Sequence, residues 1–416
     1  MIINLINKIK EDESFAFYRN ISSSVFSHGL SLLISFIGAI LMARTLGAEG
    51  RGVVAWVVAF GALGSGLVQF GMSNANRRFA AEKPESTPDL LLLTILITFG
   101  LSLIAIPSFF LMGINGEIGQ NNLLALFIGL LIIPTWGFSA CIGELLIGVG
   151  RSKSYNFIVL VNKIITTLAI LFLAITGLAT PLSVVTAISG AYIVQAIFGF
   201  WFVRDYFVIK FSYFKWIKSH LRSYMWANYF ANLCGLFPIA ILPILLGSFS
   251  NLENGGWYMA VMTLINAIAV IPSMISMYLV PKFVAIKSLA EKKIFITHIL
   301  KITLFITGII CIPAYILSDW LIPLLFGKDF TEASEVFRVM LIGHIANSIV
   351  SILQSIITTQ NNSRLILIGP IAFAVTCLTV SFLTIAEYGA VGAALAWSIG
   401  LFASLSANVI IMRKIY

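Results

Sequence analysis

Few residues of this chain could do chemistry inside its long apolar segments. Glu144 is the one carboxylate there, and His28 and His344 are histidines in similar surroundings. A lone acid in an apolar environment needs a cation or a proton, so Glu144 either pairs with Lys163 on the next predicted helix or titrates. The two histidines are either neutral, hydrogen-bonded core residues or proton carriers. These three residues are the candidates for exchanging a proton or responding to an ion.

The remaining polar groups in or beside those segments are cations and amides. Arg77 and Arg78 close one predicted helix, and Lys163 and Lys301 lie within two others. Lys301 is one turn from a helix end, so its stem can snorkel to the interface. Lys163 lies about 12 Å deep at 1.5 Å per residue, so it either snorkels or faces a cavity. Cations and amides can together replace the hydration of an anionic, hydroxyl-rich ligand. The amide candidates for such a site are Asn228, Asn232, Asn347 and Gln354.

No catalytic or metal-binding set accompanies these residues in the sequence. Glu144 has no second carboxylate in an apolar segment with which to share acid–base work. The four cysteines, Cys141, Cys234, Cys311 and Cys377, all fall within apolar segments and are typical of small buried residues. The chain also lacks a phosphate-binding loop and a nucleophile elbow. We therefore expect no enzyme, no metal site and no cofactor.

The composition indicates that these polar groups belong to a membrane protein. The chain has 416 residues, of which 59% are hydrophobic and 10% are charged, with a mean hydropathy of +1.00. Soluble proteins carry about 25% charged residues, so an ordinary soluble enzyme and a disordered chain are excluded. We therefore attribute the basic pI, near 9.4, to the membrane rather than to DNA, and we expect no nucleic-acid partner.

Hydropathy predicts an all-α protein with about twelve membrane-spanning helices. Each needs about 20 mostly apolar residues to cross the hydrocarbon, and a further apolar segment, 320–326, lies between the ninth and tenth. The predicted spans are 21–43, 53–72, 90–112, 123–149, 156–177, 182–203, 223–247, 257–280, 298–318, 336–359, 365–385 and 391–412.

The positions of lysine and arginine orient these spans. With both termini in the cytoplasm, 20 of the 26 cations fall in cytoplasmic segments. Four, Arg44, Arg51, Lys328 and Arg338, fall outside, and the other two lie within spans. Cytoplasmic loops are enriched in lysine and arginine. If one span had been missed, every later loop would be assigned to the opposite side of the membrane. The distribution therefore favours twelve spans with both ends cytoplasmic. Residues 1–10 add the pattern of a short helix lying in the interface.

The chain divides into two lobes of six spans, predicted at 1–203 and 223–416. Leu46-Gly47 followed by Trp56 is echoed by Leu246-Gly247 followed by Trp257. Because six is an even number, both halves start on the same side, and the repeats are parallel. Such lobes typically move about a central cavity.

Two segments could serve that movement. The basic cytoplasmic linker 204–222 is either an amphipathic segment on the anionic leaflet or a plain connection. The seventh span contains Gly235, Pro238 and Pro243. It is either a bending helix or a helix with static kinks.

Three short motifs resemble those of a known family. The first outside loop, Ala43-Arg44-Thr45-Leu46-Gly47-Ala48-Glu49-Gly50-Arg51-Gly52, resembles the ARxLGxExxG loop of the polysaccharide transporter (O-antigen flippase) family. That family belongs to the multidrug/oligosaccharidyl-lipid/polysaccharide exporter superfamily. Segments 71–80 and 325–330 are similar to its glycine-rich segment and its LFGxxF/Y element, and length and span count agree across the chain.

The matching loop residues are Arg44, Gly47, Glu49 and Gly52. We interpret this loop as a structural cap. The two glycines permit a positive φ, and Arg44 pairs with Glu49.

The resemblance implies a flippase. Its substrate would be an oligosaccharide linked to undecaprenyl pyrophosphate, moved from the inner to the outer leaflet of a bacterial inner membrane during O-antigen or lipopolysaccharide biosynthesis. Arg77, Arg78 and Lys163 would meet the pyrophosphate, the four amides would meet sugar, and Glu144, His28 and His344 would couple transport to an ion gradient. Membrane lipid and other polysaccharide-assembly membrane proteins are the further partners implied.

Two alternatives stay open at this stage. One is a multidrug cation antiporter of the same superfamily, which a cation-lined cavity disfavours. The other is a membrane glycosyltransferase or polymerase, which usually needs a large outside loop or a carboxylate cluster. The first predicted span carries His28 and no arginine before Arg44. This departs from the lipid II flippase branch and argues against a peptidoglycan precursor as substrate.

Overall fold

The computed structural model describes residues 13–208, 212–359 and 363–415. In these residues the regular structure consists of α-helices and short 3-10 helices, as the sequence predicts for an all-α membrane protein. The predicted interfacial helix at 1–10 lies outside the described residues.

The first half of the chain forms the helices α2 to α9. Their bounds are α2 Glu13–Gln69, α3 Met72–Glu82, η1 Pro84–Ser86, α4 Thr87–Ile114, α5 Glu117–Asn121, α6 Leu123–Leu130, α7 Ile132–Gly148, α8 Ser152–Thr176 and α9 Pro181–Val203, with η2 Arg204–Tyr206 after them.

The second half forms α10 to α16. The bounds are α10 Phe214–Phe249, α11 Leu252–Ile268, α12 Val270–Ala285, α13 Leu289–Ile316, α14 Ser318–Phe326, η3 Lys328–Phe330, α15 Ala333–Ile357 and α16 Ser363–Ile415. The apolar segment at 320–326 thus becomes the short helix α14. Because α10 begins at Phe214, the second half of the predicted linker 204–222 continues into it; the lobe boundaries themselves stay a prediction.

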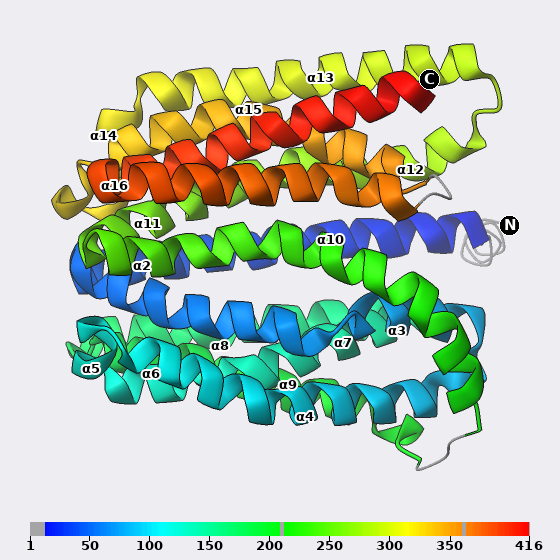
Figure 1. The fold of residues 1–416 in the computed structure, drawn as a ribbon, viewed down its shortest axis with the longest axis horizontal. Coiled ribbons are helices and arrows are strands. Elements are labelled where there is room, and N and C mark those ends of the chain that lie inside the picture. The colour runs from blue at the N-terminus through cyan, green and yellow to red at the C-terminus, as the bar shows by residue number, and fades with distance from the viewer. Residues whose placement is uncertain (1–12, 209–211, 360–362, 416) are drawn as a thin grey trace, which may run out of the picture.

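Two of these helices are each folded back on themselves at a glycine. Gly47 in α2 has φ 67° and ψ −173°, and Gly389 in α16 has φ 52° and ψ −126°. A residue with a Cβ rarely adopts this backbone, and the chain reverses at both points (Figure 1). In the described residues ten helices are long and apolar enough to cross a membrane. If each arm of the two hairpins is counted as a separate span, the number of spans becomes twelve, as predicted from the sequence. The count of twelve stays a prediction.

The molecule has two ends that differ in their connections. The glycine hairpins of α2 and α16 lie at one end, which we call the hairpin end. The described chain begins and finishes at the other, which we call the terminal end (Figure 1). In Figure 1, α4 to α9 form one lobe and α11 to α16 the other, and the first arm of α2 lies with α10 between them. The parallel repeat and its lobe boundaries stay a prediction.

The buried core that combines α2 with the second lobe lies at the hairpin end. One cluster combines Ala43 and Ala48 of α2 with Leu246, Phe326 and other residues of the second half. A neighbouring cluster of the first lobe includes Ala240 from α10. At the terminal end the described buried residues form two separate clusters, drawn from 72–217 and from 279–412. Among the described buried residues, the core that both lobes share therefore lies at the hairpin end, and at the terminal end Ile217 packs the start of α10 against the first lobe.

The second span breaks within the bundle. Phe70 has φ 45° and Gly71 has φ 76°, so α2 stops and α3 starts in a new direction. A left-handed conformation costs a residue with a Cβ about 1–2 kcal/mol. The Tyr229 hydroxyl of α10 donates to the Leu67 carbonyl at 3.1 Å, a carbonyl that lies beside the break. The predicted bending helix, by contrast, runs without interruption from Phe214 to Phe249, with two prolines inside it.

We expect Gly71→Ala to lower the free energy of unfolding by about 1 kcal/mol, because alanine resists the positive φ of this position. The matched control is Gly190→Ala, in the middle of α9. A Cβ added there meets nothing within 4 Å, so the change should be neutral or stabilising by up to about 1 kcal/mol. Thermal unfolding in detergent compares the two. Equal effects would contradict a strained break at Gly71.

Candidate functional site

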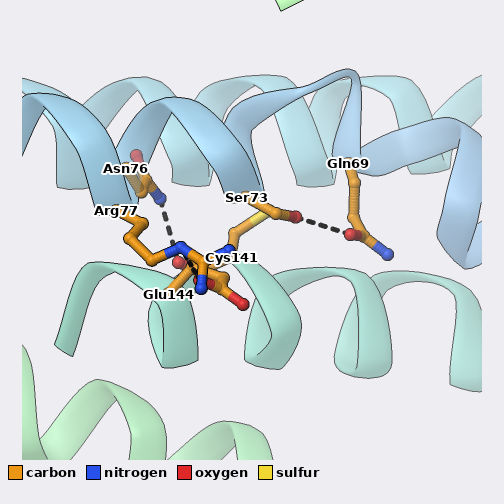
Figure 2. A network of polar contacts seen from close by, with 6 residues as sticks. All are labelled: Gln69, Ser73, Asn76, Arg77, Cys141 and Glu144. Carbon is orange, nitrogen blue, oxygen red and sulfur yellow. Dashed lines mark hydrogen bonds and ion pairs between the residues drawn. The ribbon is translucent and has the colours of Figure 1, made fainter. Parts of the chain in front are cut away.

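The candidate site begins with an ion pair between α3 and α7. Nε of Arg77 lies 3.0 Å from Oε2 of Glu144, and the arginine side chain is 54% exposed. Figure 2 shows both side chains in the space between the two helices. The described contact of the ion pair is made by Nε, and the two terminal nitrogens of a guanidinium can meet an anion in a bidentate manner.

A polar network fixes α3 against its neighbours behind this pair. The buried Asn76 amide donates to the Thr94 hydroxyl at 2.9 Å and to the Cys141 carbonyl at 3.0 Å. The Ser73 hydroxyl donates to Oε1 of Gln69 at 2.6 Å, across the break between α2 and α3 (Figure 2). Because Asn76 is adjacent to Arg77 in the sequence, these bonds also set the direction in which Arg77 leaves the helix.

Glu144 does not pair with Lys163, which was one of the two alternatives for this carboxylate. Glu144 lies four residues before the end of α7, about 6 Å from the terminal end of its helix, whereas Lys163 lies about 16 Å into α8. The two groups are therefore at different depths. Lys163 is half-buried, and the ion pairs described for this chain do not include it.

The other predicted binding residues are scattered over both lobes. Arg78 is exposed and lies 3.8 Å from Glu82 on its own helix. Asn232 is exposed on α10, and Asn347 is half-buried on α15. The Gln354 amide donates to the Ile366 carbonyl at 2.9 Å, which ties α15 to α16. Among the described contacts, none joins these side chains to the Arg77–Glu144 pair.

The histidine candidates have different outcomes. His344 is fully buried, and neither ring nitrogen has a hydrogen-bond partner among the described residues. The choice between a hydrogen-bonded core histidine and a proton carrier therefore stays a prediction for His344. The side chains of His28 and Asn228 lie outside the part of the chain that is described in detail. Within that part, no group of three or more His, Cys, Asp or Glu residues could hold a metal ion.

A second site joins the lobes at the hairpin end, and sequence reasoning missed its central residue. Arg51 was counted among the cations on the outside of the membrane, and its side chain is buried, with an exposure of 4%. It donates to the Ala39 carbonyl at 2.7 Å, to the Met259 carbonyl at 3.1 Å and to the Thr263 hydroxyl at 3.1 Å. Its guanidinium also lies 5.3 Å from the centre of the Phe326 ring. One buried cation thus links both arms of α2 to α11 and α14 of the other lobe.

Small residues allow the backbones to meet beside Arg51. A Cβ on Gly52 would overlap the Leu252 carbonyl, and one on Gly256 would overlap the Ala48 carbonyl. The prediction that Gly52 permits a positive φ is therefore wrong, because Gly52 is helical. Its lack of a side chain instead allows the backbones of α2 and α11 to come close together. We call the contact of 44–52 with 252–263 and 324–329 the hairpin-end seam.

The family-like motifs meet in this seam. Nε of Arg44 donates to the Leu325 carbonyl at 2.9 Å, and its terminal nitrogen donates to the Leu324 carbonyl. The predicted Arg44–Glu49 pair is not among the described ion pairs, and Glu49 is exposed. The Trp257 indole donates to the Asp329 carbonyl at 2.8 Å. The loop motif and the Leu-Phe-Gly motif, far apart in the sequence, are therefore two sides of one contact.

These features define a class of protein. A multi-pass helical membrane protein with two lobes that meet closely in a seam at one end has an architecture suited to an alternating-access carrier. The sequence profile described as polysaccharide biosynthesis protein matches residues 17–287. The chain belongs to this family.

Solved structures with the same fold agree in their architecture. An inward-facing multidrug resistance MATE family transporter of the MOP superfamily superposes with a TM-score of 0.71 at 12% identity, over 92% of this chain and 94% of that one. The lipid II flippase MurJ in an inward closed conformation gives 0.71 at 14% identity, over 94% and 87%. An outward-facing MATE family transporter gives 0.63 at 12% identity, over 98% and 96%. The curated proteins contain no match to this sequence.

Proposed function

We propose that this chain is a flippase that moves an oligosaccharide linked to undecaprenyl pyrophosphate from the inner to the outer leaflet of the bacterial inner membrane. The observation that carries the proposal is the hairpin-end seam in a chain of the polysaccharide biosynthesis family. If the terminal end is cytoplasmic, as the distribution of lysine and arginine predicts, the end opposite the seam faces the leaflet on which such a lipid is made.

Arg77 is the best placed of the predicted pyrophosphate ligands. It is exposed, belongs to the terminal half of the first lobe and is held by a network rather than by a long flexible loop. A pyrophosphate arriving there would compete with Glu144 for the guanidinium, because both are anions that arginine binds. Lys163, Arg78 and the amides would complete the site as the lobes move, and the polyprenyl tail would remain in the lipid.

We expect Arg77→Gln to reduce export of lipid-linked repeat units roughly 10- to 100-fold, the effect of losing one hydrogen-bonded charge contact. Lys153→Gln is the control, since it removes a cation from an exposed position on α8 of the same lobe. Export is measured by surface polysaccharide at matched protein levels. An Arg77→Gln variant that exports as well as Lys153→Gln would contradict a role for Arg77 in binding.

Coupling to a proton or sodium gradient through Glu144, His28 or His344 belongs to the same proposal. Glu144→Gln tests the first of these residues. Export that no longer responds to collapse of the gradient would support coupling through Glu144. Export that remains gradient-sensitive would leave Glu144 as a competitor for Arg77 only.

A further inference from the structure

A basic hollow lies on α13, away from the Arg77–Glu144 pair and from the seam. Lys293, Ile294, Thr297, His298 and Lys301 line a space of about 320 Å³ on the outer face of this helix. All five are exposed. In Figure 1, α13 lies along the edge of the molecule, and its first turns are at the terminal end.

This face of α13 is turned away from the protein core. Ile296 and Thr303, on the opposite side of the helix, are buried. Beyond Lys301 the exposed face becomes apolar, with Phe305 at 70%, Ile309 at 56% and Ile312 at 62% exposure. An exposed apolar face on a helix that can cross a membrane contacts lipid chains. The cations therefore lie within the first four turns of a lipid-facing helix surface.

The depth of the cations matches the headgroup region. Lys301 is eight residues beyond Lys293, about 12 Å further along the helix axis. A single lysine at the edge of a span needs only to snorkel, but here two lysines and His298 surround one space. The described ion pairs include neither lysine, and Lys292 lies instead over the Phe283 ring at 5.1 Å. The positive charge of the hollow is therefore not neutralised by a carboxylate of the described chain.

We propose that this hollow binds the phosphate headgroup of an anionic phospholipid. The phosphodiester accepts hydrogen bonds from Lys293, Lys301 and His298, and the acyl chains lie along Phe305 and the apolar residues after it. The continuous apolar face favours a lipid over a soluble phosphate, which has nothing to place there. Basic residues at a membrane surface attract anionic lipid in this way.

The full chain reconstituted in bilayers of phosphatidylglycerol and phosphatidylcholine tests this proposal, with retained lipid identified by native mass spectrometry. We expect the double variant Lys293→Gln, Lys301→Gln to lower phosphatidylglycerol affinity roughly 30-fold, the effect of two surface-proximal cations. Phosphatidylcholine retention should not change. Lys293→Arg, Lys301→Arg should keep the affinity, because the charges remain.

The control is Lys153→Gln, Lys215→Gln, which removes the same charge from two other exposed positions at the terminal end. An equal loss in this control would overturn the proposal, since the effect would then be one of net charge. Full displacement of phosphatidylglycerol by inorganic phosphate would also overturn it, because the hollow would then take phosphate rather than lipid. Unchanged affinity in the double glutamine variant would overturn it directly.

Discussion

Gly52→Ala is expected to abolish export, whereas Gly255→Ala should leave it unchanged. The added Cβ at position 52 would overlap the Leu252 carbonyl, but the one at 255 would lie 3.7 Å from the nearest atom of Gly52, an ordinary contact. Both changes replace glycine in a helix and gain up to about 1 kcal/mol of helix propensity. Their difference therefore isolates the close approach of α2 and α11, for which overpacking costs about 1–3 kcal/mol.

The expected loss follows from the transport cycle. Alternating access requires that the substrate site be open to one side of the membrane at a time. A carrier that cannot close its hairpin end cannot meet this requirement. Surface polysaccharide at matched protein levels measures export, and spin labels at Thr45 and Thr331, both exposed, measure the width of the seam. Gly52→Ala should widen it, and Gly255→Ala should not. Normal export by Gly52→Ala would show that the seam is dispensable.

Arg51→Gln should shift the protein towards a state that is open at the hairpin end. Hydrogen bonds to a charged group contribute about 1.5–3 kcal/mol each, and Arg51 gives two of its three across the lobes, to the Met259 carbonyl and the Thr263 hydroxyl. Loss of even one of these bonds, about 2 kcal/mol, corresponds to a change of roughly 30-fold in the equilibrium between the two states. Arg51→Lys should not restore the seam, because an ammonium lacks the planar fork that reaches acceptors in several directions.

Arg338→Gln provides the control at the same end of the molecule. Arg338 pairs with Asp319 within the second lobe and makes no contact across the seam among those described. The same pair of spin labels should report a longer distance for Arg51→Gln and an unchanged one for Arg338→Gln. If both variants kept the wild-type distance, the hydrogen bonds of Arg51 would not hold the two lobes together.

The fold was predictable because its main determinants are local. Apolar length defines each span, and the two helix hairpins occur where glycines permit a positive φ, at Gly47 and Gly389. The break at Phe70–Gly71 could not be predicted in this way, since Phe70 adopts a conformation that phenylalanine disfavours. The seventh span is one continuous helix with two prolines inside it, so the choice between a bending helix and static kinks stays a prediction.

The site was harder to predict because it depends on which helices touch. Glu144 could be recognised as an acid within an apolar segment, but its partner depends on the packing of α3 against α7, and Arg77 rather than Lys163 lies at its depth. Arg51 was assigned to a loop because it follows the first predicted span. The signal for its burial was the pair Gly50 and Gly52 around it, which marks a close helix contact, followed at once by an apolar segment.

The most direct test of the proposed function is translocation by the purified chain. Proteoliposomes receive the lipid-linked repeat unit extracted from a strain that lacks this gene, with a glycan-modifying reagent added outside. We predict that units from the inner leaflet become accessible with wild-type protein and remain protected with Arg77→Gln and Gly52→Ala. Protection that is equal in protein-free and wild-type vesicles would contradict the flippase account.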